Sequence, residues 1–163
     1  MSFTPIFKFL KALAKNNNRN WFEKHKPDYL LAKAEFQSFI SSLLIKMIVF
    51  DPALSALDPK KLTFRIYRDV RFSKNKAPYK NSFSGGFSRA TQALRGGYYF
   101  HLQPGGNSMV GGGFWQPNTS DLKRIREEIA ADPSSLREII NSASFREHFG
   151  NLGGEQLKIN PRG

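Results

Sequence analysis

The 163-residue chain contains no cysteine, which excludes disulfides and thiolate-bound metal ions. This absence agrees with a reducing compartment, so a cytoplasmic protein is expected. The longest apolar run, residues 43–50, is interrupted by Lys46 and is far shorter than the roughly 20 residues that a membrane-spanning helix needs. The first residues also lack the basic and apolar segments of a signal peptide. No membrane partner is therefore expected.

Acidic residues are scarce, and their deficit is local. The chain has 25 Lys and Arg against 13 Asp and Glu, a net charge of +12. Residues 60–80 contain eight basic residues and one acid, Asp69, while residues 118–163 have equal numbers of both signs. A localised positive surface interleaved with aromatic residues is typical of a site for an anionic partner. The alternative is a surface that serves only solubility or is neutralised by sequence outside these 163 residues.

The spacing of apolar residues predicts helices at both ends of the chain and strands in the middle. Helical periodicity covers residues 4–15, resumes in a short helix near Asn18 and continues from Pro27. The period changes to two at residues 62–67, where Leu62, Phe64 and Ile66 would face one way and Thr63, Arg65 and Tyr67 the other. The other expected strands are 83–88, 97–103 and 108–115, with helices again after Pro117. We therefore predict a single α+β domain over residues 1–163, with N-terminal helices, a central antiparallel sheet of about four strands and C-terminal helices.

The best candidate site is the basic stretch at residues 65–80. On a regular strand, Arg65, Tyr67, Asp69 and Arg71 would share one face, with Arg68 as an exception that a break or bulge near Asp69 would relieve. The planar fork of arginine suits phosphate or carboxylate, and tyrosine can stack on a base. The candidate ligand-binding residues are Arg65, Tyr67, Arg68, Arg71, Lys74, Lys76, Tyr79 and Lys80. The predicted partner is an anionic ligand, nucleic acid or nucleotide; the alternative is an internal Arg–Asp network that braces the fold.

Two residues in the middle of the chain are candidates for catalysis. His101 lies in an expected strand and is the best general acid–base if its face adjoins that of the arginines, and Asp69 is the second candidate. These residues suggest a metal-independent enzyme acting on a small anionic substrate as an alternative function, and a structural or interaction protein as another. The sequence has no His-x-His, no Glu-x-x-His and no phosphate-loop lysine after its glycine clusters. Neither a metal nor another cofactor is expected.

The basic stretch also carries a family resemblance. Its sequence, Arg-Ile-Tyr-Arg-Asp-Val-Arg-Phe-Ser-Lys-Asn-Lys-Ala-Pro-Tyr-Lys, resembles the signature of a bacterial and fungal conserved-hypothetical family catalogued as domain of unknown function 2461. Three further segments agree, at residues 7–26, 98–117 and 154–163. Family members often have an acid where this chain has Asn75, and they usually continue past the final Pro-Arg-Gly, so a C-terminally incomplete chain is expected. The resemblance implies no activity, but it strengthens residues 65–80 as the candidate site.

Overall fold

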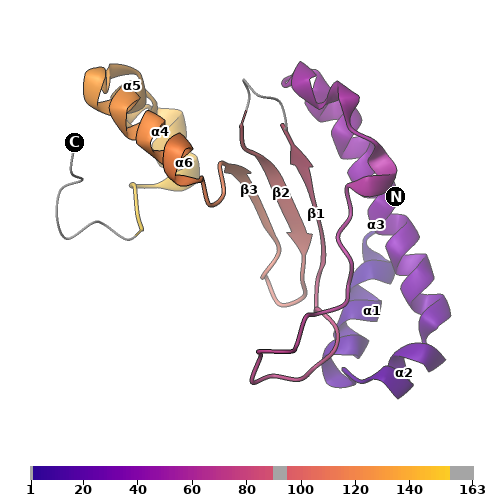
Figure 1. Ribbon diagram of the computed structural model, residues 1–163. Coiled ribbons are helices and arrows are strands. Elements are labelled where there is room, and N and C mark those ends of the chain that lie inside the picture. The colour runs from indigo at the N-terminus through magenta and orange to yellow at the C-terminus, as the bar shows by residue number, and fades with distance from the viewer. Residues whose placement is uncertain (1, 90–94, 155–163) are drawn as a thin grey trace. The chain divides into compact units, whose positions relative to one another are not determined.

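Helices form the N-terminal third of the protein, where the apolar spacing predicts them. The computed structural model describes residues 2–89 and 95–154. The bounds are α1 Thr4–Lys15, α2 Arg19–Lys24 and α3 Lys26–Ile48, followed by the short 3₁₀ helices η1 Pro52–Ala56 and η2 Pro59–Lys61 (Figure 1). The side chain of Asn18 caps α2 by accepting a hydrogen bond of 2.9 Å from the Trp21 backbone N–H. α3 has Pro27 in its first turn, where a proline costs no helical hydrogen bond.

The centre of the chain is an antiparallel meander. Its strands are β1 Phe83–Ser88, β2 Gly97–Leu102 and β3 Met109–Gly113, in the order β1-β2-β3. Phe83 pairs with Leu102 and His101 pairs with Met109, which sets the register of the two ladders. The α+β fold with a central antiparallel sheet is confirmed, with three strands instead of about four.

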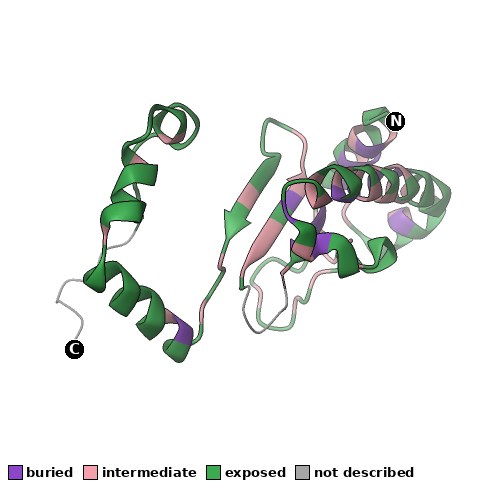
Figure 2. Cartoon of the chain, turned by 90° about the horizontal axis from the view of Figure 1, so that it is seen from above, coloured by how far each residue is buried: buried purple, intermediate pink, exposed green. Residues whose placement is uncertain are grey.

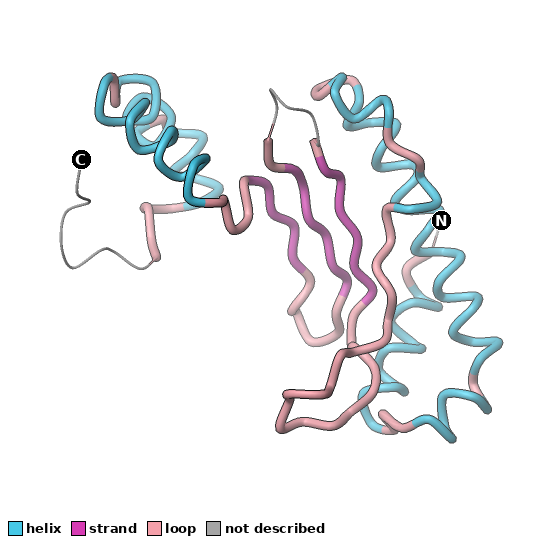
Figure 3. Tube along the Cα trace, in the orientation of Figure 1, coloured by secondary structure: helices cyan, strands magenta, loops and turns pink. Residues whose placement is uncertain are grey.

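The missing strand is the one predicted over residues 62–67. This segment lies beside residues 78–86, but it forms only two isolated pairs, Thr63 with Gly85 and Tyr67 with Tyr79 (Figure 3). Between those pairs, the three residues 64–66 lie opposite the five residues 80–84. Because one segment has two residues more than the other, a continuous ladder cannot form. The alternation of faces fails with it, because Phe64 is 49% exposed while Leu62 and Ile66 are buried. The prediction of a regular strand here is therefore wrong.

The hydrophobic core lies between the N-terminal helices and one face of the sheet (Figure 2). Its members include Ile6 and Leu10 from α1, Phe36 and Ile40 from α3, and Phe83 from β1. The ring of Phe83 packs against an aromatic ring of α3, because the Phe36 and Phe83 ring centroids lie 5.6 Å apart. This packing fixes the position of β1. It therefore also fixes residues 62–64, which lie along the outer edge of β1.

The chain divides into two compact units, residues 1–115 and residues 116–163, and the remaining helices belong to the second. They are α4 Thr119–Ala131, α5 Ser134–Asn141 and α6 Ala143–Phe149. Most of their apolar side chains are exposed, including Ile139 at 56% and Phe149 at 74%. The single domain stays a prediction. None of the helices in the described ranges is long and apolar enough to cross a bilayer.

Candidate functional site

A closed loop carries most of the basic stretch. The backbone N–H of Arg68 donates to the Pro78 carbonyl at 2.8 Å, and that of Lys80 donates to the Ile66 carbonyl at 2.8 Å. These two bonds join residues 66–68 to residues 78–80 and close a loop over residues 69–77, which we call the basic loop. Because this part is a loop, the shared strand face expected for Arg65, Tyr67, Asp69 and Arg71 is not formed. The change of direction comes near Arg68, the residue that broke the alternation.

Two of the predicted ligand-binding cations hold the basic loop together. The guanidinium of Arg68 donates to the Ala77 carbonyl at 2.9 Å and to the Ser73 hydroxyl at 3.3 Å. The ammonium of Lys76 donates to the carbonyls of Val70 and Arg71, at 3.1 and 3.4 Å. The bonds of Arg68 are half-buried and those of Lys76 are exposed, and both sets connect residues on opposite sides of the loop, so they stabilise its conformation. The role of Arg68 and Lys76 in ligand binding stays a prediction.

A third cation, Arg71, is paired with the only acid of the stretch. Its Nη2 lies 2.7 Å from Asp69 Oδ2, and its Nε donates to both carboxylate oxygens, at 3.0 and 3.2 Å. The side-chain hydrogen bonds from Arg71, then the bond from its backbone N–H, lower the pKa of Asp69, and the charge of Arg65 adds to this effect. Asp69 is therefore an ionised acceptor near neutral pH, which suits it to positioning Arg71 better than to proton transfer.

The other three predicted cations have no partner of this kind. Within the described residues, the side chains of Arg65, Lys74 and Lys80 make no hydrogen bond and no ion pair. Arg65 and Lys74 are exposed, and Lys80 is half-buried. The basic stretch is thus divided between cations that shape the loop and cations that remain open to solvent beside it.

The two tyrosines of the stretch differ in exposure. Tyr79 is only 3% exposed and stacks on Phe22, with the ring centroids 4.0 Å apart and the planes 11° from parallel. Its burial raises the pKa of its hydroxyl. Tyr67 is 48% exposed, with its ring centroid 5.3 Å from that of Tyr79. Tyr67 is therefore the tyrosine with a ring open to a stacking ligand.

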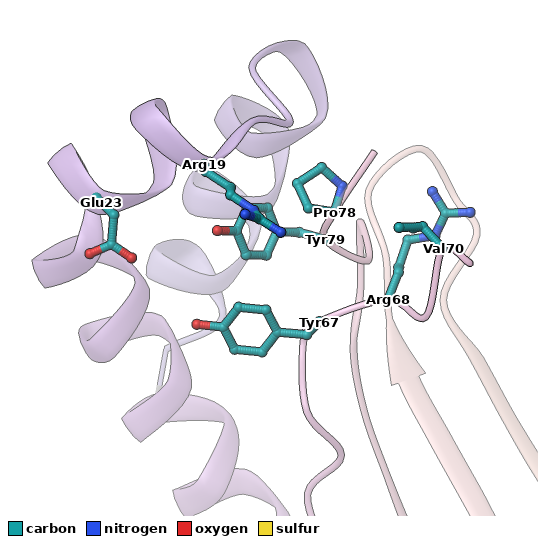
Figure 4. Close-up of a pocket in the computed structure, with 7 residues that line it drawn as sticks. All are labelled: Arg19, Glu23, Tyr67, Arg68, Val70, Pro78 and Tyr79. Atoms are coloured by element: carbon teal, nitrogen blue, oxygen red, sulfur yellow. The ribbon is translucent and has the colours of Figure 1, made fainter. Parts of the chain in front are cut away.

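A shallow pocket of about 320 Å³ lies between α2 and the neck of the basic loop (Figure 4). Its lining residues are Arg19, Glu23, Tyr67, Arg68, Val70, Pro78 and Tyr79. In Figure 4 the guanidinium of Arg68 points away from Tyr67, which agrees with its bonds inside the loop. The charged groups of α2 at the pocket, Arg19 and Glu23, were not predicted as site residues. Their only signal in the sequence was their place in a segment that resembles the family's opening.

His101 is held within its own hairpin. Its Nε2 lies 2.6 Å from the Asn107 carbonyl and its Nδ1 lies 3.3 Å from the Tyr99 hydroxyl. A carbonyl can only accept, so Nε2 carries the proton and Nδ1 accepts from Tyr99 in the neutral ring. Within the described chain, the side-chain hydrogen bonds and the ring contact of His101 are all made to Tyr99 and Asn107. A catalytic role for His101 or Asp69 stays a prediction.

A buried polar cluster that the sequence did not indicate lies at the other end of the sheet. Asp51, 8% exposed, accepts a hydrogen bond of 3.0 Å from the Tyr98 hydroxyl. Arg89 Nε lies 3.0 Å from the same carboxylate oxygen, an ion pair without an aligned hydrogen bond. Burial, then the bond to Asp51, raises the pKa of Tyr98. The cluster neutralises a buried carboxylate and ties the end of α3 to β1 and β2.

Among the described residues, no three His, Asp or Glu side chains are grouped as a metal site would require. Residues 5–163 match the model of the family described as "Conserved hypothetical protein (DUF2461)". The chain belongs to the DUF2461 family. No curated protein and no solved structure matches it. The description of the DUF2461 family assigns no activity.

Proposed function

We propose that this DUF2461 protein binds phosphate-bearing ligands, nucleotide or nucleic acid, through the basic loop, its flanking cations and the adjoining pocket. One observation carries the proposal: Arg65, Lys74 and Lys80 present charges without a hydrogen-bonding or ion-pairing partner in the described chain. Cations of this kind form charge-assisted hydrogen bonds with phosphate oxygens and release counterions on binding.

The bracing of the loop supports the same function. Arg68, Lys76 and the Asp69–Arg71 pair fix the backbone that carries Lys74 and precedes Lys80. A loop that is already ordered loses less conformational freedom when it binds a ligand. The exposed ring of Tyr67 adds a stacking surface beside these charges, which favours ligands with bases over inorganic phosphate.

The geometry gives less support to a metal-independent enzyme. Both candidate acid–base groups already have partners: Asp69 is paired with Arg71, and His101 is bonded to the Asn107 carbonyl. A general base has to reach the proton that it removes, and an acceptor already bonded to arginine is a weak one. Binding is therefore the function that the site supports best.

A salt titration tests the proposal. We expect a labelled single-stranded oligonucleotide of mixed sequence to bind the protein at about 50 mM salt, and binding to weaken steeply by about 200 mM. Replacing Arg65, Lys74 and Lys80 together with alanine removes three cations. At about 0.7 per phosphate contact on single strands, the slope of log affinity against log salt should become shallower by about 2.

A charge-matched control separates a site from general attraction. Arg124, Arg126 and Arg137 lie in α4 and α5, are exposed, and remove the same charge when changed to alanine. The proposal expects this control to keep most of the affinity and slope. Equal losses in the two triple variants would reduce the effect to net charge, and no binding by the unaltered protein at low salt would overturn the nucleic-acid form of the proposal.

A further inference from the structure

The pocket beside the basic loop contains a carboxylate that a site for phosphate alone would not need. Glu23 lies one helical turn after Arg19 on α2, and both line the pocket. Lys26 approaches Glu23 at 3.5 Å, but both side chains are more than half exposed, at 55% and 60%, so the pair is weak. The carboxylate thus remains available as an acceptor at the edge of a basic surface.

The tyrosine hydroxyls of the pocket point toward this carboxylate. In Figure 4 the hydroxyls of Tyr67 and Tyr79 both extend toward the side of α2 that carries Glu23. Burial and then Tyr67 raise the pKa of Tyr79 most, the charge of Glu23 raises it further, and the charge of Arg19 lowers it, so both charged groups act on this hydroxyl. The pocket therefore offers an acceptor from Glu23 and a cation from Arg19 above a floor of aromatic rings.

This combination selects the chemistry of a ligand. An ionised carboxylate only accepts hydrogen bonds, so it repels a bare phosphate and attracts an amino group. Arg19 prefers an anion, and the exposed ring of Tyr67 prefers a flat, unsaturated ring. A volume of about 320 Å³ lies at the small end of the roughly 300–1,000 Å³ of ligand pockets, which suits a single nucleotide.

We propose that the pocket takes one nucleotide with an amino-bearing base, whose exocyclic amine donates to Glu23 while the base stacks on Tyr67 and the phosphate faces Arg19. The inference rests on the proposed phosphate-binding function and adds a selectivity to it. The nucleotide arrives free in solution or as one residue of a strand whose other phosphates meet Arg65, Lys74 and Lys80; the chemistry recognised in the pocket is the same.

The test compares two ligands that differ in one group. Calorimetry with adenosine 5′-monophosphate and with purine riboside 5′-monophosphate, which lacks the exocyclic amine, should show the amine-bearing nucleotide bound about tenfold more tightly, the size expected for a hydrogen bond to a charged group. Glu23→Ala should abolish this ratio by weakening the adenosine nucleotide while leaving the amine-free one unchanged or tighter. A variant that merely unfolds would weaken both. Glu138→Ala, an exposed carboxylate on α5, is the matched control and should keep the tenfold ratio.

A second arm separates the sources of the ligand and the two proposals. Short single strands of deoxyadenosine and of its amine-free analogue are titrated in the same way. A Glu23-dependent preference seen only with strands supports the inference with the nucleotide as part of a nucleic acid. Equal binding of amine-bearing and amine-free ligands in both formats overturns the inference while salt-sensitive strand binding keeps the proposed function. No binding of any of these ligands overturns both.

Discussion

The side-chain amide of Asn17 bonds both backbone groups of Tyr79, as a residue of a neighbouring strand would. Its Nδ2 donates to the Tyr79 carbonyl at 2.9 Å, and its Oδ1 accepts from the Tyr79 backbone N–H at 3.1 Å. The same Nδ2 also reaches the Asn81 side chain at 3.0 Å. One residue between α1 and α2 thereby anchors the end of the basic loop to the helical layer, and it positions α2, which supplies Arg19 and Glu23, against the pocket.

Replacing Asn17 with alanine should therefore lower the free energy of unfolding. The backbone groups of Tyr79 lose both partners in a half-buried place, which costs about 1–3 kcal/mol. Urea denaturation followed by circular dichroism measures the change. Asn20→Ala, at an exposed position of α2, is the control and should change stability by less than about 0.5 kcal/mol. Equal effects of the two variants would contradict the anchoring role.

Loss of the Arg68 guanidinium should open the basic loop without unfolding the protein. Arg68→Met keeps much of the length of the side chain but removes the donors to Ala77 and Ser73. Phe72, 96% exposed, gives chymotrypsin a cleavage site within the loop. If the lost bonds were worth about 1–2 kcal/mol to the closed loop, cleavage after Phe72 should become roughly five- to thirtyfold faster.

The control for this digestion is Arg65→Met, because Arg65 makes no side-chain hydrogen bond in the described chain. Its cleavage rate should match that of the unaltered protein. A rate that rises equally in both variants would show that positive charge, and not the bonds of Arg68, limits access of the protease to the loop.

The pairing of Asp69 with Arg71 predicts a measurable titration. Because hydrogen bonds from Arg71 lower the pKa of Asp69 in the folded protein, the pair stabilises the fold above the unfolded pKa of Asp69 and this contribution is lost as pH falls through the folded pKa. Carbon-detected NMR of the carboxyl group should show Arg71→Gln raising the pKa toward its usual value. Arg65→Gln should raise it less, since Arg65 acts only through its charge. The reverse order of the two variants would contradict the geometry.

Local signals explain which parts of the fold could be predicted. Asn18 and Pro27 mark the starts of α2 and α3 because caps and first-turn prolines act within a few residues. The strand predicted at residues 62–67 failed for a reason outside that segment: the ladder depends on the number of residues in its partner, and residues 80–84 hold two too many. Alternation in one segment cannot report the register of another.

The position of the candidate site could be predicted from the sequence, but the roles of its individual residues could not. The exception at Arg68 in the alternating pattern suggested a break or bulge near Asp69, and the loop closes at Arg68. Which cations the loop uses depends on where its own carbonyls point, so the division between Arg68 and Arg65 was not visible in the sequence. Glu23 was missed because the pocket joins α2 to a neck more than 40 residues later in the chain.

The buried bond between Tyr98 and Asp51 should contribute to stability in a pH-dependent way. Tyr98→Phe removes a hydrogen bond to a buried carboxylate and should lower the free energy of unfolding by about 1.5–3 kcal/mol in urea denaturation. The folded pKa of Tyr98 is raised, so this contribution is complete below the unfolded pKa of tyrosine and is lost as pH rises through the folded one. Tyr99→Phe, which removes an exposed contact to His101, is the control and should cost less.

A side chain at Gly85 should destabilise the protein, because the backbone of Leu62 lies directly against this glycine. A Cβ at Gly85 would meet the Leu62 carbonyl oxygen at 2.5 Å and Ile40 Cδ1 at 3.4 Å, whereas a Cβ at Gly111 in β3 would meet nothing within 4 Å. Gly85→Ala should therefore lower stability by about 1–3 kcal/mol or more, since a backbone carbonyl cannot move as a flexible side chain does, and Gly111→Ala should stay within about 0.5 kcal/mol. To accommodate the added methyl group, residues 62–68 would have to shift away from β1, so Gly85→Ala should also speed cleavage at Phe72. A destabilised variant with an unchanged cleavage rate would show that the basic loop does not depend on its attachment to β1.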